Sequence, residues 1–419
     1  MQKPKGTKDI FGLDILIKQK IQEILSRIAI NFNYFQIETP IFEYLEVFNK
    51  QIGENSEIVE KQMYVFKDKQ KRLLVLRPEH TAAVLRAYIE NKFFDKKEYQ
   101  KLFYFGQTFR YENPQAGRQR QFNQFGVECF LEKNHYIDAE IIHLASNILK
   151  NLNIKYKLLI NSFGNENEKK SYVLALKDYF SKNIDKLSNN SKKNVYKNPL
   201  RILDSKEKKD EAIIKSSPKI NQYWSLETKE YFEKVLLILK QLNIEYEVDY
   251  HLVRGLDYYN GLIFEFLPID NEKQQATIIG GGRYDNLINR MSSINRDTIG
   301  FAIGIERLIK NLDINQFIEK HQLLKTNVFV YIINLLDITK DYSFKILNIL
   351  RENKIHSEIN HQIKPLKKLL DKYDSFNPTH FIIIGKNEFE TKTVTIKKNQ
   401  ENITIKIDEI TNYFKNQET

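Results

Sequence analysis

Apolar residues recur along this chain at two spacings, one typical of helices and one typical of strands. Over residues 14–31 they lie three or four positions apart, which predicts an amphipathic helix. Residues 43–50 predict a short second helix, and Pro78 predicts the first turn of a helix that runs through Glu90. Another helix is predicted over residues 138–152. The first part of the chain is therefore expected to contain helices that each bury one face.

Short aromatic and β-branched runs between these helices indicate strands. The early runs lie at residues 35–41, 63–66, 73–76, 102–111 and from Gln121 onward. The later runs lie at residues 246–253, 262–267, 276–279 and 299–304, with a helix predicted after them at residues 305–312. A run of three glycines, residues 280–282, follows the third of these later strands. It matches neither a P-loop nor a G-x-G-x-x-G fingerprint, so it favours a tight turn where two backbones approach closely.

Composition changes along the chain suggest domain boundaries. Residues 165–245 are rich in Lys, Asn, Ser and acidic residues, yet helical spacing persists at 172–180 and 232–239. We interpret this stretch as an inserted helical module, with a long flexible excursion as the alternative. Strands and helices alternate over the last hundred residues or so, which predicts a small α/β domain with a mixed sheet. The expected domains are residues 1–164, 165–245, 246–318 and 325–419.

Charge and composition narrow the class of protein. The 419 residues include 65 Lys and Arg against 54 Asp and Glu, a net charge of +11 that suits a polyanionic partner. The abundance of Lys, Asn, Ile and Tyr also fits an AT-rich coding sequence, which leaves that inference open. Cys129 is the single cysteine, so an intramolecular disulfide and a Cys-rich metal site are excluded. No apolar run approaches about 20 residues and the N-terminus lacks the apolar core of a secretory signal, so a cytoplasmic protein without membrane spans is expected.

One predicted hairpin, residues 107–128, concentrates candidate chemistry. Arg110, Arg118 and Arg120 lie on or beside it, and arginine forks match phosphate oxygens bidentately. Phe122 and Phe125 offer faces on which a base could stack. The alternative is a solvated hairpin tip that is rich in Arg and Gln.

Several stretches together resemble the class II aminoacyl-tRNA synthetases. Residues 109–112 (FRYE) resemble motif 2 of that class, and residues 300–307 (GFAIGIER) resemble motif 3, about two hundred residues later. Residues 38–40 (ETP) stand where motif 1, the dimer motif with its proline, is expected. Residues 252–259 (LVRGLDYY) and 280–285 (GGGRYD) are similar to the two histidine-specific motifs of the histidyl-tRNA synthetase family. Residues 4–9, 76–81 and 198–204 extend this resemblance over essentially the whole chain.

The resemblance implies an α+β fold. A six-stranded antiparallel catalytic sheet with helices is expected, with a helical insertion and a C-terminal α/β anticodon-binding domain. It also implies a homodimer that converts L-histidine and ATP to histidyl-adenylate and pyrophosphate, then transfers the histidyl group to the 3′ end of tRNA(His).

Two competing functions are weighed against this one. A regulatory paralogue that binds histidine, such as the regulatory subunit of ATP phosphoribosyltransferase, would lack the C-terminal domain and the ATP-binding arginines, yet Arg110, Arg118, Arg254 and Arg307 are all present. A generic nucleic-acid-binding protein would explain the charge but none of the motifs.

The resemblance also implies roles in binding ATP. Arg110 and Arg254 are expected at the α-phosphate, where fixed cations stabilise the transition state. Arg118 is expected at the γ-phosphate, and magnesium with the β- and γ-phosphates. Arg307 and Phe122 should enclose the adenine ring, and Glu112 should bind its amino group. No metal ligand is assigned to a protein side chain.

Histidine and tRNA contacts follow in the same way. The α-ammonium is expected to meet Glu79, Thr81 and Gln124. The imidazole needs partners for both ring nitrogens, and Glu128 and Tyr259 match those family positions, with Arg254 and Tyr258 also lining the pocket. Asn113 and Gln115 are expected to contact tRNA. For Tyr258 and Tyr259 the alternative is ordinary strand aromatics, and for Glu79 a first-turn carboxylate favoured by the helix dipole.

Three positions depart from the family pattern. Asn113 replaces an arginine, so one cationic contact to the tRNA acceptor end is expected to be missing. His80 replaces a small residue and is interpreted either as packing or as narrowing the pocket mouth. Asn260-Gly261 replaces a bulkier pair.

Overall fold

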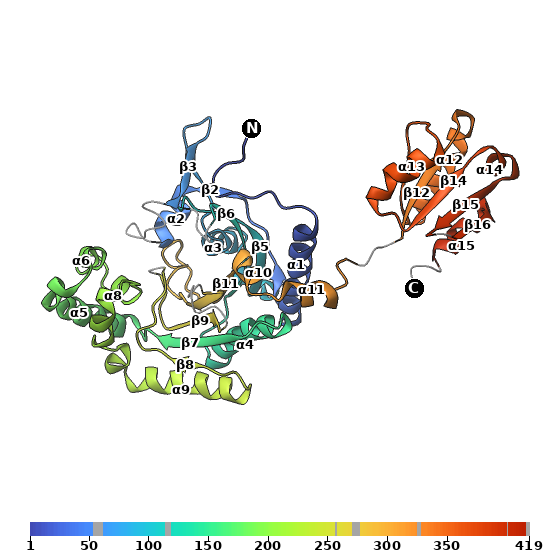
Figure 1. Ribbon diagram of the computed structural model, residues 1–419. Helices are drawn as coiled ribbons and strands as arrows, with labels where there is room; N and C mark the ends of the chain where they lie inside the picture. The colour runs from blue at the N-terminus through green and yellow to red at the C-terminus, as the bar shows by residue number, and fades with distance from the viewer. Residues whose placement is uncertain are drawn as a thin grey trace. The chain divides into compact units, whose positions relative to one another are not determined.

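The computed structural model describes residues 1–52, 62–113, 119–255, 258–269, 277–324, 328–399 and 401–415. The chain forms two compact units, Met1–His321 and Gln322–Thr419 (Figure 1). No helix in the described ranges is both long enough and apolar enough to cross a membrane.

An eight-stranded sheet organises the first unit. Its order is β1 (Phe35–Gln36), β5 (Lys101–Phe109), β6 (Gln121–Cys129), β11 (Ile299–Gly304), β10 (Ile279–Arg283), β9 (Leu262–Pro268), β7 (Tyr156–Ser162) and β8 (Glu247–Val248). The strands from β5 to β7 are antiparallel to their neighbours, whereas β1 and β8 pair in parallel at the two edges. Six strands, from β5 to β7 in this order, therefore form the predicted antiparallel sheet, and the two short parallel edge strands extend it to eight.

Two strand predictions need correction. The run at 246–253 forms a strand only over Glu247–Val248, because the backbone turns at Asp249, whose carbonyl accepts from the Leu252 amide at 2.9 Å. The strand predicted over residues 276–279 instead covers Ile279–Arg283 as β10, a central strand that contains the three glycines, so the glycines do not form a turn. Their missing side chains permit close packing, because a Cβ on Gly281 would overlap the carbonyl oxygen of Gly300 on β11.

Helices pack against this sheet and contribute buried residues to its hydrophobic core. They are α1 (Leu13–Asn31), α3 (Thr81–Glu90), α4 (His135–Asn151), α10 (Ile305–Lys310) and α11 (Ile314–Lys320). Most of α3 is buried, and α4 buries Ile141, Ile142 and Leu144. The predicted helix at Pro78 begins at Thr81 instead, because the side chain of Glu79 accepts the backbone N–H groups of Thr81 and Ala82 and so caps the helix there.

A smaller antiparallel sheet lies beside the main one. It has the order β2 (Phe42–Tyr44), β4 (Leu73–Leu76) and β3 (Tyr64–Lys67), and α2 (Leu45–Ile52) packs against it. Its central strand β4 matches the predicted bounds.

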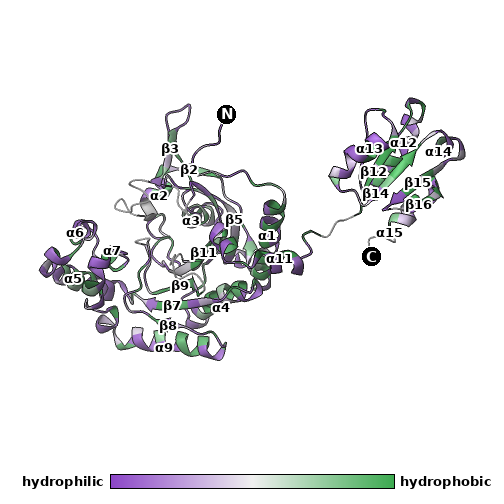
Figure 2. Cartoon of the chain, viewed as in Figure 1, coloured by the Kyte–Doolittle hydropathy of each residue, from purple (hydrophilic) through white to green (hydrophobic). Residues whose placement is uncertain are grey.

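Residues 166–241 form a segment of helices. It consists of α5 (Glu166–Lys182), α6 (Asn189–Asn194), α7 (Leu200–Leu203), α8 (Lys208–Lys215) and α9 (Leu226–Gln241). The part before α9 has a core of its own, whereas α9 packs against α4. Tyr172, Leu176 and Phe180 on one face of α5 pack with Val195 and Ile202. In Figure 2 the helices of this segment show hydrophobic and hydrophilic residues side by side, as amphipathic helices do. The segment is folded, so the flexible excursion considered from composition does not describe it.

The second unit is an α/β fold around a mixed sheet. Its strand order is β13 (His356–Ile359), β12 (Phe329–Asn334), β14 (His380–Ile384), β15 (Thr393–Lys398) and β16 (Glu401–Lys406). The first three strands are parallel and the last two antiparallel. Helices α12 (Lys340–Glu352), α13 (Leu366–Tyr373), α14 (Lys386–Thr391) and α15 (Ile410–Lys415) accompany it. The predicted mixed sheet is confirmed.

Candidate active site

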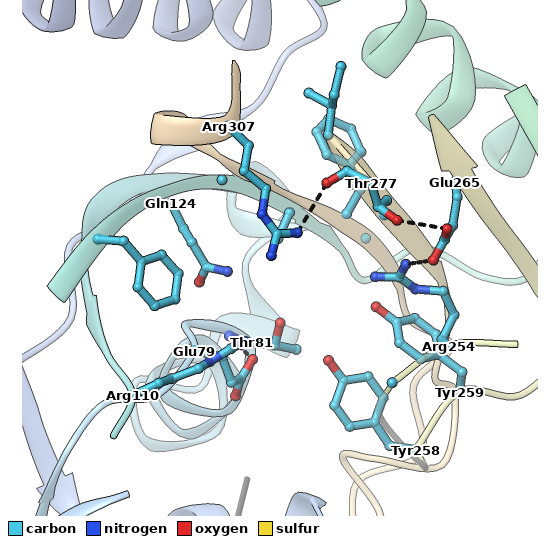
Figure 3. A pocket seen from close by; sticks show the side chains of 18 of the residues that line it. Glu79, Thr81, Arg110, Gln124, Arg254, Tyr258, Tyr259, Glu265, Thr277 and Arg307 are labelled. Carbon is cyan, nitrogen blue, oxygen red and sulfur yellow. Dashed lines mark hydrogen bonds and ion pairs between the residues drawn. The ribbon is translucent and has the colours of Figure 1, made fainter. Parts of the chain in front are cut away.

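One pocket on the open face of the main sheet gathers most of the predicted site residues (Figure 3). They come from the start of α3, from the residues that follow β5, from β6, from the loop before β9 and from α10. The predicted residues that line it are Glu79, Thr81, Arg110, Glu112, Phe122, Gln124, Glu128, Arg254, Tyr258, Tyr259 and Arg307. Asn113 is exposed and is not one of the lining residues. Gln115 and Arg118 lie outside the described residues.

The side chain of Glu128, on β6, is buried and accepts hydrogen bonds from three hydroxyl groups. Its side chain accepts from the hydroxyls of Thr81 at 2.8 Å, Tyr104 at 3.3 Å and Tyr284. The residue is 1% exposed, and this burial raises the pKa of Glu128 to about 8, although the three hydroxyls act in the opposite direction. A carboxyl group in this state can accept hydrogen bonds or donate one, so it can pair with either nitrogen of a neutral imidazole.

Two of the residues that supply these hydroxyl groups, Tyr104 and Tyr284, were not among the predicted site residues. Tyr284 belongs to the GGGRYD stretch, which was the available signal for it. Tyr104 stands among the strand aromatics of β5, and only the strand's position in the sheet reveals its role. Glycines make room for both side chains. A Cβ on Gly126 would overlap the Tyr104 hydroxyl, and one on Gly300 would overlap the Tyr284 hydroxyl as well as Oε2 of Glu128.

Two further acceptors line the same pocket. The Glu79 carboxylate is 4% exposed and accepts the backbone N–H groups of Thr81 and Ala82, each at 2.8 Å. Burial raises the pKa of Glu79. Oε1 of Gln124 is buried without a hydrogen-bond partner. Glu79 is therefore both the helix-capping carboxylate and a pocket residue, and the pocket retains acceptor capacity for a cation.

Arg254, which also lines this pocket, forms an ion pair with Glu265. Its Nη1 donates to Oε1 of Glu265, and Oε2 of Glu265 accepts from the Thr277 hydroxyl at 2.8 Å (Figure 3). Burial alone would lower the pKa of Arg254, but the Glu265 carboxylate raises it, so the guanidinium stays charged. Its Nε is buried without a hydrogen-bond partner. Glu265 and Thr277 were missed from the sequence, where nothing distinguishes them from ordinary strand residues.

Two more arginines complete a cationic part of the pocket. Arg110 donates from Nε to the carbonyl of Pro78 at 2.8 Å, and its guanidinium lies 5.4 Å from the ring centre of Phe122. Burial lowers the pKa of Arg110, but it leaves an arginine protonated near neutral pH. Arg307 donates from Nη1 to the carbonyl of Thr277 at 3.3 Å. In this structure Arg110 lies against Phe122, and the pairing of Arg307 with Phe122 around an adenine stays a prediction.

Tyr258 and Tyr259 form one wall of the pocket. Both are buried, and their ring centres lie 4.7 Å apart. Tyr258 also packs against Tyr284 at 5.6 Å. Neither residue lies in a strand, so the interpretation as ordinary strand aromatics is wrong.

His80 lies behind the pocket and not at its mouth. Its ring stacks on Tyr104, with centres 4.3 Å apart and planes at 17°. The side chain is 2% exposed, and burial with the nearby Arg77 lowers the pKa of His80 to about 3. His80 therefore acts as neutral packing beneath Tyr104, and the idea that it narrows the pocket mouth is not supported by its position.

The site separates two kinds of chemistry. Three arginines can hold an anionic polyphosphate and stabilise charge that develops on it. Glu79, Gln124 and Glu128 can hold the cationic and hydrogen-bonding groups of a small amino acid. Among the described residues, no group of three or more His, Cys, Asp or Glu could hold a metal ion. Asp204, from the helical segment, also lines the pocket.

An antiparallel sheet that carries arginines and a substrate pocket on its open face, with a separate α/β unit after it, is the arrangement of class II aminoacyl-tRNA synthetases. A model of the family described as "Histidyl-tRNA synthetase" matches residues 6–308, and one described as "Anticodon binding domain" matches residues 329–417. The chain belongs to the histidyl-tRNA synthetase family.

Individual relatives agree over the full length of the chain. A protein named "Histidine--tRNA ligase" from Malacoplasma penetrans is 40% identical over 99% of this chain and 98% of its own. One of the same name from Bacillus subtilis is 39% identical over 98% of each. The crystal structure of apo histidyl-tRNA synthetase from S. aureus is 33% identical and covers 99% of this chain and 100% of its own, with a TM-score of 0.78.

Proposed function

We propose that this pocket activates L-histidine with ATP, releasing pyrophosphate, and transfers the histidyl group to the 3′ end of tRNA(His). This is the histidine–tRNA ligase reaction for which the full-length relatives are named. The observation that carries it is the placement of Arg110, Arg254 and Arg307 in the same pocket as Glu79 and Glu128. The reaction requires both a polyphosphate grip and a histidine-specific pocket, and these residues can supply them.

At the ATP end, we assign Arg110 and Arg254 to the α-phosphate. Negative charge grows there as the histidine carboxylate attacks and pyrophosphate leaves, and guanidinium groups that are already in place lower the barrier. The Glu265 ion pair would hold Arg254 ready for this role. Arg307 and Phe122 would enclose the adenine, Glu112 would accept from its amino group, and Arg118 would hold the γ-phosphate.

At the histidine end, we assign the α-ammonium to Glu79, Thr81 and Gln124. The buried amide oxygen of Gln124 gains a partner when this ammonium arrives. Glu128 and Tyr259 would bind the two imidazole nitrogens, with Tyr258 as a side wall. A site that pairs both nitrogens disfavours amino acids that lack them, because its own buried polar groups would be left unpaired.

Magnesium is proposed to enter with ATP. Mg²⁺ prefers to keep several waters and to bind substrate phosphates with one or two carboxylates.

The tRNA is proposed to contact both units. Asn113 and Gln115, after strand β5, would meet the acceptor end, and the second unit would bind the anticodon. The net charge of +11 favours association with the phosphate backbone. Because tRNA is charged where translation takes place, we propose a cytoplasmic location.

A homodimer is proposed on the basis of an exposed apolar face. Phe42, Tyr44 and Phe66 share one face of the small β2-β4-β3 sheet, and each is between 42% and 53% exposed. The rings of Phe42 and Phe66 lie 6.4 Å apart, so the exposed groups are neighbours. Apolar groups gathered in this way mark an interaction surface. A particle mass in solution equal to that of one 49.8-kDa chain would contradict this assignment.

The direct test is histidine-dependent exchange of pyrophosphate into ATP. Purified protein should exchange with L-histidine and not with other amino acids. Binding of histidine without any exchange would instead favour the regulatory-paralogue function, because such a protein needs only the amino-acid pocket.

A further inference from the structure

The first turn of α5 touches both histidine-specific stretches of the chain. Nζ of Lys169 donates a hydrogen bond to the backbone carbonyl of Tyr259, in the first stretch. Oε1 of Glu166 accepts from Nδ2 of Asn286, directly after the second stretch, at 2.6 Å. Glu166 and Lys169 are three residues apart, so they project from the same face of the helix. One helical turn therefore connects the helical segment to the wall of the histidine pocket.

This turn is itself firmly fixed. The Asn165 side chain accepts the amides of Asn167 and Glu168, both at 3.0 Å, and Glu168 returns the contact to the Asn165 amide at 2.7 Å, which makes a capping box. Glu168 also accepts from the Ser225 amide at 2.7 Å, at the start of α9. The position of Lys169 is thus set by the packing of two helices of the segment.

The placement of Lys169 is not explained by helix stability. A cation near a helix N-terminus meets the positive end of the helix dipole and is disfavoured there. Nζ of Lys169 instead reaches out of the helix, 4.7 Å from the ring centre of Phe163, to the Tyr259 carbonyl. The interaction therefore stabilises the segment that Lys169 contacts more than the helix that carries it.

The segment that Lys169 contacts forms a shared wall. Tyr258 and Tyr259 line the candidate active site on one side and a second pocket, lined also by Lys169 and Lys170, on the other. Directly after the Tyr259 carbonyl, the Asn260 amide donates a hydrogen bond to the carbonyl of Arg283 at 2.8 Å. Because a pocket lies on each side of Tyr258 and Tyr259, the position of these two residues depends on hydrogen bonds to their backbone and not on close packing alone.

We propose that Lys169 is a positioning residue for histidine binding, which holds Tyr259 against the pocket so that histidine affinity depends on the docking of α5. The proposal rests on the proposed function for the identity of the ligand. Lys169 acts through Tyr259 and does not touch the substrate. Without the hydrogen bond from Lys169, Tyr259 is free to move toward the second pocket. The imidazole of histidine then loses Tyr259 as a preorganised partner.

The test compares Lys169→Met with Lys170→Met, an exposed neighbour on the same helix that lines the second pocket. In ATP–pyrophosphate exchange, Lys169→Met should raise the histidine KM about tenfold, as expected for a charge-assisted hydrogen bond, and change the ATP KM less than about twofold. Lys170→Met should match the wild type. Lys169→Arg, which retains a cationic donor, should restore most of the histidine affinity.

Equal histidine KM values for Lys169→Met and Lys170→Met would overturn the proposal, as would parallel rises in the KM for histidine and for ATP. If Lys169→Met lowers the urea midpoint, Lys169→Gln, which keeps a polar donor with a shorter reach, takes its place in the same comparison. Calorimetric titration with histidine in the absence of ATP distinguishes a failure of the proposed function from a failure of the role proposed for Lys169. A wild type without exchange contradicts the proposed function, whereas the ratio of histidine Kd values among the variants still decides the role of Lys169.

Discussion

The guanidinium of Arg254 lies against the α-carbon of Gly280, so closely that a Cβ at position 280 would overlap Nη1, Nη2 and Cζ of the arginine. A glycine in a central strand normally weakens the sheet, because it contributes no side chain to pack. Here the missing side chain is replaced by the cation that we assign to the α-phosphate. Strand β10 thus supplies both hydrogen bonds to the sheet and the space in which Arg254 lies.

Gly280→Ala should therefore reduce adenylate formation without unfolding the sheet. The added methyl group displaces a flexible side chain and not a backbone, so the fold can adjust while the guanidinium moves away. We expect kcat for histidine-dependent exchange to fall about 10²-fold, comparable to the loss of one transition-state donor, with a small change in the histidine KM. Gly385→Ala, in the second unit, is the control outside this pocket, because a Cβ there would first meet the flexible carboxylate of Glu388 at 3.2 Å. Wild-type exchange in Gly280→Ala would contradict the role given to Arg254.

Arg254→Ala tests the same cation by removing it. Adenylate formation should fall 10²- to 10³-fold, measured by single-turnover kinetics, because a fixed positive charge at the α-phosphate is lost. Histidine affinity, measured by calorimetry, should change little. The substitution also leaves the carboxylate of Glu265 without its ion-pair partner, so some loss of stability is expected. Arg290→Ala, at an exposed arginine outside this pocket, should leave the rate unchanged, and an equal loss there would point to a general effect of charge.

Glu128 should make the stability of the ligand-free protein depend on pH. Its pKa is raised from 4.5 to about 8, so the folded protein holds a proton that the unfolded chain releases between these values. This contribution to the free energy of unfolding is complete below about pH 4.5 and is lost as the pH rises toward about 8. Urea denaturation across this range should show that decline in the wild type and a smaller one in Glu128→Gln, which cannot ionise. Identical pH profiles would show that Glu128 is ionised in the folded state.

Removal of Gln322–Thr419 should affect tRNA far more than ATP. The first unit contains the complete described pocket, and the second unit matches an anticodon-binding family. We expect the KM for tRNA(His) in aminoacylation to rise at least tenfold, while the ATP KM in pyrophosphate exchange stays near its wild-type value. Comparable increases in both would mean that the second unit is needed for the catalytic fold and would weaken its assignment to the anticodon.

Most elements of the first unit follow from local patterns. The amphipathic spacing of residues 14–31 predicts the start of α1 to within one residue. The apolar runs at residues 73–76 and 299–304 have the same bounds as strands β4 and β11. In the second unit the alternation of strands and helices predicts the mixed sheet that the structure contains. These elements bury a clear apolar face, so the periodicity of the sequence contains the information.

Other elements depend on neighbours that lie far away in the sequence. The edge strands β1 and β8 contain two residues each, and only their pairing with β5 and β7 makes them strands. The three glycines of β10 give no apolar signal, and their strand is defined by β9 and β11 on either side. Local composition favoured a turn there because it cannot register those partners.

By itself, the sequence determined the order of the motifs and, through the family resemblance, the residues that would bind ATP and histidine. It placed Glu79, Glu128 and Arg254 on separate segments, and only the GGGRYD stretch that contains Tyr284 pointed to a residue that supports them. Only the tertiary structure decided that Tyr104 and Tyr284 join Glu128, that Glu265 holds Arg254, and that Lys169 on α5 reaches the carbonyl of Tyr259. Each of these contacts joins residues that a strand pairing or a helix contact brings together, so the physical cause lies in the packed fold and not in any local run of the chain.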